Sequence, residues 1–217
     1  MVGAVDIGGT KVAVGVVDDQ GKVLSARESP TGLDCDYARG LDVIACMLKD
    51  LTRMLGVEMS GIGIGSTGPV EPFTGEFGEV DFLPKWRGKN LVKDLGQIFN
   101  ISVALENDAD AGALAEAGWG AGKDKSRLIY VTVGTGIGGG IILDRKLYRG
   151  VDGAHPEIGH QVLDPSGPLC SCGFRGCWES LAAGPAMSAW LGSSAPADYP
   201  HGLGLTAKGI CQLAIEG

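Results

Sequence analysis

Residues 2–17 read VGAVDIGGTKVAVGVV, two valine-rich runs at residues 2–8 and 11–17 that are broken by the turn Gly8-Gly9-Thr10. Asp18-Asp19-Gln20-Gly21 then turns the chain into a third run, residues 22–28. Runs of β-branched residues separated by glycine and aspartate turns predict strands that follow one another in space. The stretch therefore predicts a β-meander at the start of the fold.

The hydrophobic period changes after this meander. Residues 34–55 place Leu and Ile at helical spacing and stop before Gly56, which predicts an amphipathic helix with a glycine at its end. Further elements predicted along the first half are a buried strand at 61–65, a short helix at 91–99, a strand at 101–105 and an alanine-rich helix to about 118. The order βββαβαβα predicts a mixed α/β layer.

The second half begins in the same way as the first. Residues 127–133 predict a strand, Gly134-Thr135-Gly136 a glycine turn with a threonine, and residues 138–143 and 146–149 two further strands. This repetition predicts an internal duplication. We expect an N-terminal domain at residues 1–120 and a second at 121–217, with helices at 178–190 and 207–215. The second domain is expected to be incomplete.

Charge and composition restrict the partners. The chain of 217 residues has a formal net charge of -8, so we expect no nucleic acid partner, because phosphate backbones require a concentrated basic surface. It has neither a basic leader nor an apolar run of membrane-spanning length, which predicts a cytoplasmic protein without a membrane partner. Cys35, Cys46 and Cys211 stand apart and are expected to be buried free thiols.

Residues 154–179 read AHPEIGHQVLDPSGPLCSCGFRGCWE and concentrate three of the six cysteines. Cys170, Cys172 and Cys177 lie within eight residues, and His160 precedes the first of them by ten. Three thiolates and one imidazole match a closed tetrahedral zinc site. The alternatives are a disulfide or ordinary buried thiols, but Cys-x-Cys disulfides make strained rings and this loop has few apolar residues. We therefore expect structural zinc.

The two glycine turns favour phosphate binding, because successive backbone N–H groups in such turns form anion sites without lysine. Residues 134–139 and 63–68 both satisfy the G-x-G-x-x-G spacing, but neither opens a helix, which argues against a dinucleotide fold. No Walker A sequence is present. The alternative is two tight hairpins that simply need glycine.

Five motifs together resemble the ROK family (repressors, open reading frames, sugar kinases). They are Asp6-Ile7-Gly8-Gly9-Thr10-Lys11, Glu106-Asn107-Asp108, residues 133–140 (VGTGIGGG), Pro156-Glu157-Ile158-Gly159-His160 and residues 170–179 (CSCGFRGCWE). The resemblance implies the actin-like ATPase/sugar kinase fold, in which two ribonuclease H-like domains surround a cleft. It also implies ATP-dependent phosphorylation of a hexose, and a possible homodimer.

The resemblance assigns ATP to the two glycine turns, with Asp6 positioned to bind Mg²⁺ through water. The ATP-binding residues implied in this way are Asp6, Gly8, Gly9, Thr10, Lys11, Gly134, Thr135, Gly136, Gly138 and Gly139.

Asp108 resembles the catalytic base that accepts the proton of the attacking C6 hydroxyl. Capping of the following helix is the simpler role for Asn107 or Asp108, and both roles are compatible. For Glu157 and Glu179 the simpler role is a solvated surface charge. The sugar contacts implied by the resemblance are Gly68, Asn107, Asp108, Glu157, His160 and Glu179.

We favour a glucokinase, with an N-acetylhexosamine (GlcNAc or ManNAc) or fructose kinase as the alternatives. Two departures from the family pattern, at residues 66–69 and 82–86, bear on sugar preference. A C-terminal portion that approaches the adenosine in the family is expected to be missing, which weakens ATP binding. The competing classes are a sugar-responsive regulator and a non-catalytic sugar-binding remnant. Regulators carry a helix-turn-helix domain ahead of the sugar fold, whereas here the first strand begins at residue 2.

Overall fold

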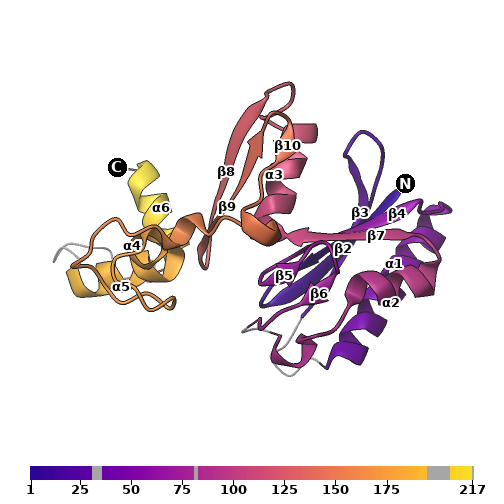
Figure 1. The fold of residues 1–217 in the computed structure, drawn as a ribbon, viewed down its shortest axis with the longest axis horizontal. Helices are drawn as coiled ribbons and strands as arrows, with labels where there is room; N and C mark the ends of the chain where they lie inside the picture. The colour runs from indigo at the N-terminus through magenta and orange to yellow at the C-terminus, as the bar shows by residue number, and fades with distance from the viewer. Residues whose placement is uncertain (31–35, 81–82, 195–205, 217) are drawn as a thin grey trace. The chain divides into compact units, whose positions relative to one another are not determined.

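The computed structural model describes residues 1–30, 36–80, 83–194 and 206–216. The chain forms two compact units, the first made of residues 1–129 and 140–155 and the second of residues 130–139 and 156–217. Both strands and helices are present in the order shown in Figure 1, so the prediction of a mixed α/β protein is confirmed. The domain boundary expected between residues 120 and 121 stays a prediction.

A five-stranded sheet forms the centre of the first unit. Its strands are β1 (Val2–Ile7), β2 (Lys11–Val17), β3 (Val23–Pro30), β4 (Gly61–Ser66) and β7 (Ser102–Asn107), in the order β3-β2-β1-β4-β7. The predicted meander is confirmed, since β1, β2 and β3 pair antiparallel in succession. Strands β1, β4 and β7 are parallel, so their carboxyl ends lie along one edge.

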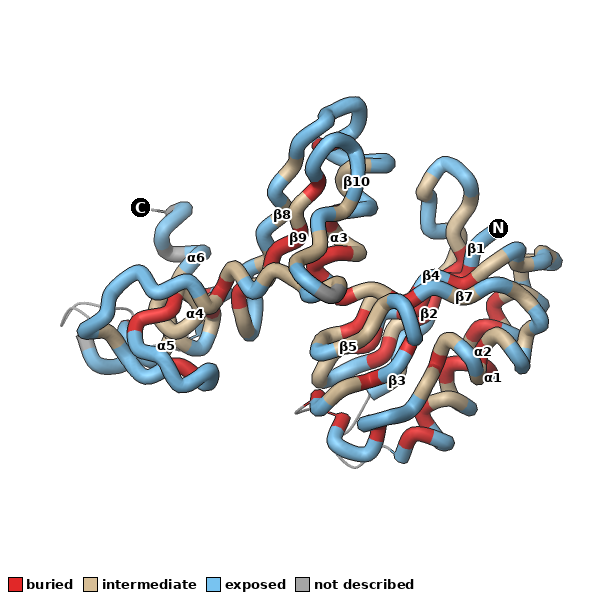
Figure 2. The backbone as a smooth tube through the Cα atoms, in the orientation of Figure 1, coloured by how far each residue is buried: buried red, intermediate tan, exposed pale blue. Residues whose placement is uncertain are grey.

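Two helices, α1 (Tyr37–Leu55) and α2 (Leu91–Phe99), lie side by side (Figure 1) and pack on one face of this sheet. Their apolar residues and those of the strands form one buried core that includes the fully buried Trp86, and the buried segments of these elements are red in Figure 2. Helix α1 ends at Gly56, whose φ of 64° suits glycine in a left-handed cap. The helix expected from residue 34 begins at Tyr37, and residues 34 and 35 lie outside the described part of the chain.

Helix α3 (Asp108–Gly118) contacts β4 and β7. Gly65 lies at this contact: a Cβ there would be 3.4 Å from the Cβ of Ala111 and 3.8 Å from the Cα of Asp108. A short hairpin of β5 (Val70–Glu71) and β6 (Glu76–Phe77) follows β4 and was not predicted. Strands of two residues are too short to produce a hydrophobic period.

A second meander follows, in the order expected from a repeat of the first. Strands β8 (Arg127–Val133), β9 (Ile137–Leu143) and β10 (Lys146–Leu147) lie in the order β10-β9-β8, as β3, β2 and β1 do. Two 3₁₀ turns follow, η2 (Val151–Gly153) and η3 (Ile158–His160), and η1 (Pro84–Trp86) precedes α2 in the first unit.

The single helix predicted at residues 178–190 is wrong. The chain instead forms α4 (Trp178–Ala182) and α5 (Gly184–Ser194), separated by Ala183 in an extended conformation. Pro185 suits this break, because proline has no N–H to continue the hydrogen bonds of α4, whereas in the first turn of α5 no such N–H is needed. The last helix, α6 (Ala207–Glu216), is confirmed, and its cap is Thr206, whose hydroxyl accepts the Gly209 N–H at 3.2 Å.

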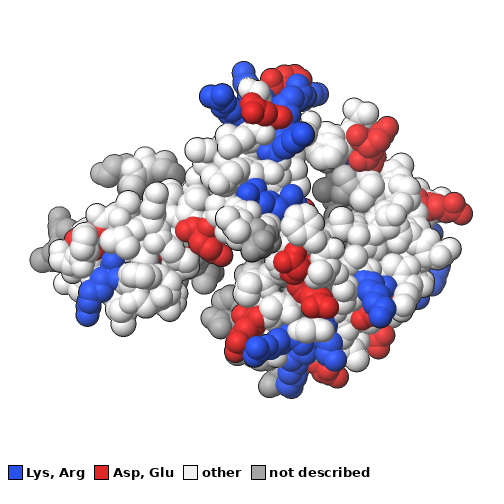
Figure 3. Space-filling view, viewed as in Figure 1, with Lys and Arg blue, Asp and Glu red and all other residues white. Residues whose placement is uncertain are grey.

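Two further expectations concern the surface. Cys46 and Cys211 are free but exposed, so the prediction that they are buried is wrong; Cys35 lies outside the described residues. Acidic and basic side chains are intermixed on the face shown in Figure 3. Within the ranges that the structure describes, no helix combines the length and apolarity needed to cross a membrane.

Candidate functional site

The carboxyl ends of β1, β4 and β7 bring together four of the residues predicted from sequence. The register aligns Asp6 with Gly65 and Gly65 with Glu106, so Asp6 lies at the same edge as the β7–α3 junction that carries Asn107 and Asp108. Gly68 adjoins this junction, since a Cβ at that position would lie 3.3 Å from Asn107 Nδ2. Ligands in α/β proteins commonly bind at such strand ends.

Asn107 and Asp108 begin helix α3. Asn107 is buried, and its Oδ1 accepts the N–H groups of Ala109 at 2.8 Å and Asp110 at 3.4 Å. Asp108 is exposed, and its Oδ1 accepts the Ala109 N–H at 2.8 Å. The expected capping role is therefore confirmed, and it orients an Asp108 carboxylate that remains accessible to a ligand.

Asp6 and Asp108 are close enough to interact through their charges. The pKa of Asp6 is raised, first because neighbouring atoms exclude part of its water and second because of the negative charge of Asp108. Two nearby negative charges repel each other, so this edge favours a cation. That charge distribution suits a Mg²⁺ ion that accompanies a nucleotide.

The first glycine turn is closed by a bond from Gly8 N to Lys11 O at 3.0 Å. Lys11 also forms an exposed ion pair with Glu28, Nζ to Oε1 2.5 Å, and this bond to Glu28 raises the pKa of Lys11. The ammonium group is thus directed along the β2–β3 hairpin, while the backbone between Gly8 and Lys11 forms the loop expected for an anion site.

A polar cluster that sequence reasoning missed lies beside the same junction. Glu106 pairs with Arg149, and the Oδ2 of Asp110, a side chain only 2% exposed, forms a hydrogen bond of 2.9 Å with His155 Nδ1. Burial raises the pKa of Glu106, while the Arg149 charge opposes this rise. The signal in the sequence was weak, because only the fold brings residues 149–155 to α3.

The second glycine turn lies in the other unit, between β8 and β9. Gly134 N donates to Gly136 O at 2.9 Å, and Gly184 N at the start of α5 donates to Gly134 O at 2.8 Å. Glu179 on α4 accepts the N–H of Ile137 through Oε2 at 2.9 Å. Glu179 is therefore a neighbour of this turn, a contact that its predicted role in sugar binding did not anticipate.

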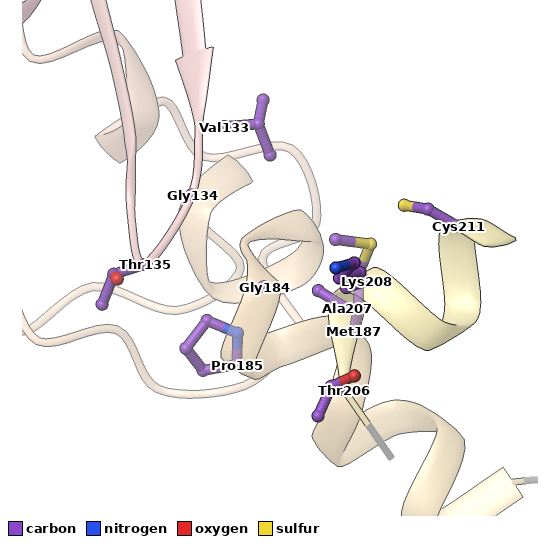
Figure 4. A pocket seen from close by; sticks show the side chains of 10 residues that line it. All are labelled: Val133, Gly134, Thr135, Gly184, Pro185, Met187, Thr206, Ala207, Lys208 and Cys211. Atoms are coloured by element: carbon purple, nitrogen blue, oxygen red, sulfur yellow. The ribbon is translucent and has the colours of Figure 1, made fainter. Parts of the chain in front are cut away.

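A cavity of about 550 Å³ opens beside this turn. Figure 4 shows Thr135 on one side, the start of α5 with Gly184 and Pro185 below, and α6 with Lys208 opposite. The remaining lining residues are Val133, Gly134, Met187, Thr206, Ala207 and Cys211. A largely apolar cavity of this size with one ammonium group and two hydroxyls suits an aromatic ligand that carries phosphate.

The predicted zinc ligands converge. One ligand atom from each of His160, Cys170, Cys172 and Cys177 lies within 4.8 Å of the others. Cys170 Sγ lies 3.4 Å from His160 Nδ1, and Cys172 Sγ lies 3.5 Å from Cys177 Sγ. Zinc lies about 2.3 Å from thiolate sulfur and about 2.0 Å from imidazole nitrogen, so these four donors fit around one tetrahedral ion after small adjustments.

The thiols in this cluster influence one another. Burial raises the pKa of Cys170, but hydrogen bonds with Cys172, Ser171 and Cys177 together outweigh that effect and lower the pKa to about 7. Burial and the neighbouring thiols raise the pKa of Cys177 to about 12. Clustered thiols that compete for protons are typical of a set that binds metal with release of protons.

The remaining predicted sugar contacts lie in the second unit with this cluster. Glu157 is exposed and precedes η3, where Gly159 packs so closely on the Ile137 carbonyl that a side chain would collide. His160 directs its Nδ1 toward the sulfur of Cys170. The first unit thus gathers Asp6, Gly68, Asn107 and Asp108, and the second gathers the Gly134–Gly139 turn, Glu157, His160, Glu179 and the cysteines.

The structure combines two strand–glycine-turn–strand units with a carboxylate at a strand end and a Cys₃His cluster. This combination defines the class of ribonuclease H-like sugar kinases and the regulators that share their fold. The chain belongs to the ROK family, whose model matches residues 2–217. Its fold is that of the ROK sugar kinases: it superposes with a TM-score of 0.78 on a ROK family glucokinase from Streptomyces griseus solved with glucose and AMPPNP. That protein is 33% identical, and the match covers 100% of this chain and 71% of that one.

Two curated relatives show the range of the family. A glucokinase from Streptomyces coelicolor is 40% identical over 185 residues, which are 84% of this chain and 56% of the relative. A xylose repressor from Bacillus subtilis is 42% identical over 129 residues, 58% of this chain and 33% of the repressor. The chain spans little more than half the length of the glucokinase that it matches.

Proposed function

We propose that the protein is an ATP-dependent sugar kinase that phosphorylates glucose at its C6 hydroxyl. The observation that carries this proposal is the β7–α3 junction, where an exposed Asp108 carboxylate is held by the helix N-terminus beside Asp6, Gly68 and Asn107. A general base must be accessible and oriented toward the hydroxyl whose proton it accepts. Similarity to the Streptomyces glucokinases supports glucose as the acceptor.

ATP is proposed to bind through backbone amides of both glycine turns. Its nucleoside would occupy the cavity beside Thr135, and the Lys208 ammonium group would neutralise part of the negative charge of its phosphates. The negative edge formed by Asp6 and Asp108 supports a role for Asp6 in binding Mg²⁺ through water. When bound, Mg²⁺ neutralises charge on the transferred phosphoryl group. Asp108 accepts the proton of the sugar hydroxyl as the phosphoryl group moves in line.

Sugar recognition is proposed to use Gly68, Asn107 and Asp108 in the first unit and Glu157, His160 and Glu179 in the second. Carboxylates and amides suit a neutral polyol, because each accepts or donates hydrogen bonds to neighbouring hydroxyls. The same contacts leave N-acetylhexosamine and fructose open as alternative acceptors.

The Cys₃His cluster is proposed to bind a structural zinc ion. The donor set and its 4.8 Å span support this role, and a closed set of four protein ligands leaves no position for substrate. Zinc would order residues 154–179, and the chemistry stays with Asp108.

A second candidate is a sugar-binding regulator without catalysis, favoured by the identity to the xylose repressor. The discriminating experiment is a coupled ADP-release assay with glucose, mannose, fructose, GlcNAc and ManNAc, run with isothermal titration of each sugar. We expect ADP release with glucose above all others. Sugar binding without ADP release would instead support the regulator or a non-catalytic remnant.

A further inference from the structure

The carboxylate of Glu179 lies on the second glycine turn. Its Oε2 accepts the backbone N–H of Ile137, the first residue of β9, at 2.9 Å. The contact depends on Gly136, because a Cβ at that position would collide with the same carboxylate. One amide at the end of the turn is thus already bonded by the protein.

The other end of the turn is bonded to the same segment of chain. Gly184 N donates to Gly134 O at 2.8 Å, and Ala183 N donates to Glu179 O at 3.0 Å. Helices α4 and α5 therefore bond the turn at Gly134 and at Ile137. Attachments on either side of Thr135 and Gly136 restrict the backbone directions that these two residues can adopt.

We propose that Glu179 is a positioning residue for the phosphate-binding turn, a role in addition to any contact with sugar. The inference rests on the proposed function, in which residues 134–139 receive ATP phosphates. A carboxylate beside that turn offers no charge attraction to phosphate, so its benefit is geometric: it fixes the turn so that the remaining amides are aligned before the ligand arrives. What Ile137 requires is a hydrogen-bond acceptor, and a neutral amide oxygen can supply one.

Comparison of two substitutions separates this role from a sugar contact that needs the negative charge. Glu179→Gln keeps an acceptor for the Ile137 N–H, whereas Glu179→Ala removes it. With the full chain and AMPPNP·Mg²⁺ in isothermal titration without sugar, we expect Kd within about threefold of wild type for Glu179→Gln and about tenfold weaker for Glu179→Ala. Amide hydrogen exchange at Ile137 should accelerate only in Glu179→Ala.

Glu116→Ala is the matched control, because it removes a bond of the same kind, Ala121 N to Glu116 Oε2 at 2.7 Å, away from the turn. Its AMPPNP affinity should equal that of wild type.

The inference is overturned if Glu179→Ala binds AMPPNP as wild type does, or if Glu179→Gln weakens AMPPNP binding as much as Glu179→Ala. If wild type itself binds no AMPPNP, the proposed function fails together with the inference. If Glu179→Ala does not fold, the test rests on Glu179→Gln alone. Weaker AMPPNP binding or faster amide exchange at Ile137 in that variant overturns the inference.

Discussion

At the scale of single residues, the site depends on side chains that have a structural and a chemical role at once. Asn107 is buried because it bonds two N–H groups of α3, and this bonding leaves the next side chain, Asp108, at the surface. The sequence predicted both the cap and the accessible carboxylate, since each follows from an Asn-Asp pair between a strand and a helix. It could not predict Glu106–Arg149 or Asp110–His155, because these pairs join residues 43 and 45 positions apart.

One residue contact makes a prediction for stability and its pH dependence. Tyr37, 7% exposed, donates its hydroxyl to Asp94 Oδ2 at 2.5 Å. Burial first, then this bond to a carboxylate, raises the pKa of Tyr37 far above its usual value. Tyr37→Phe should lower the free energy of unfolding at pH 7 by about 1–3 kcal/mol, the usual loss for a hydrogen bond to a charged group.

The pH dependence of that effect follows from the direction of the shift. The unfolded chain releases the Tyr37 proton near pH 10 whereas the folded chain retains it, so wild-type stability falls as pH rises above 10. Tyr37→Phe lacks this contribution, and the difference between the two proteins should shrink between pH 9 and about 11. Urea unfolding at several pH values measures it. Equal stability at pH 7 would contradict the account.

At the scale of elements, glycines decide how closely helices approach their neighbours. Gly40 on α1 faces Trp86, and a Cβ there would collide with the indole ring. Gly96 on α2 has room, since its nearest neighbour would be the Ile101 carbonyl oxygen at 3.6 Å. Alanine has a higher intrinsic helix propensity than glycine at both positions. The effects of the two substitutions on stability should therefore differ only because the packing around Gly40 and Gly96 differs.

Gly40→Ala should therefore destabilise the protein by about 1–3 kcal/mol through overpacking, even though it gains helix propensity. Gly96→Ala, the matched control, should stabilise it by about 0.5–1 kcal/mol. Chemical denaturation of both variants checks the pair. A stabilising Gly40→Ala would show that α1 and Trp86 are not packed as described.

The elements also show how far sequence patterns extend. Long periodic segments such as α1 and the two meanders were predicted because their hydrophobic period repeats several times. The β5–β6 hairpin was missed because its strands have two residues each, and the break at Ala183 was missed because the apolar pattern continues through Pro185. The carboxyl-end cluster could be predicted from motifs, whereas the cavity beside Thr135 could not, since α5 and α6 supply most of its lining.

At the scale of the molecule, metal binding is predicted to stabilise one part of the chain selectively. Structural zinc sites supply on the order of 10 kcal/mol of apparent binding free energy. If zinc binds His160 and the three cysteines, chelation should accelerate amide hydrogen exchange in residues 154–179 while the sheet β3-β2-β1-β4-β7 stays protected. The KM for sugar should rise before global unfolding begins.

Cys172→Ser should reproduce the effect of chelation, and Cys46→Ser, an exposed thiol on α1, is the control that should change neither exchange nor KM. Elemental analysis of the purified protein should find about one zinc per chain. A protein without zinc whose sugar KM is unaffected by Cys172→Ser would exclude the structural role.

The most direct test of the central claim is the rate of glucose 6-phosphate formation from glucose and ATP by wild type and Asp108→Asn. The amide retains the size of the side chain and can still accept the Ala109 N–H, so folding and thermal midpoint should be preserved. Because the general base is lost, kcat should fall by roughly 10²-fold to 10⁴-fold. Near-normal turnover in Asp108→Asn, or no product from wild type with any hexose, would contradict the account.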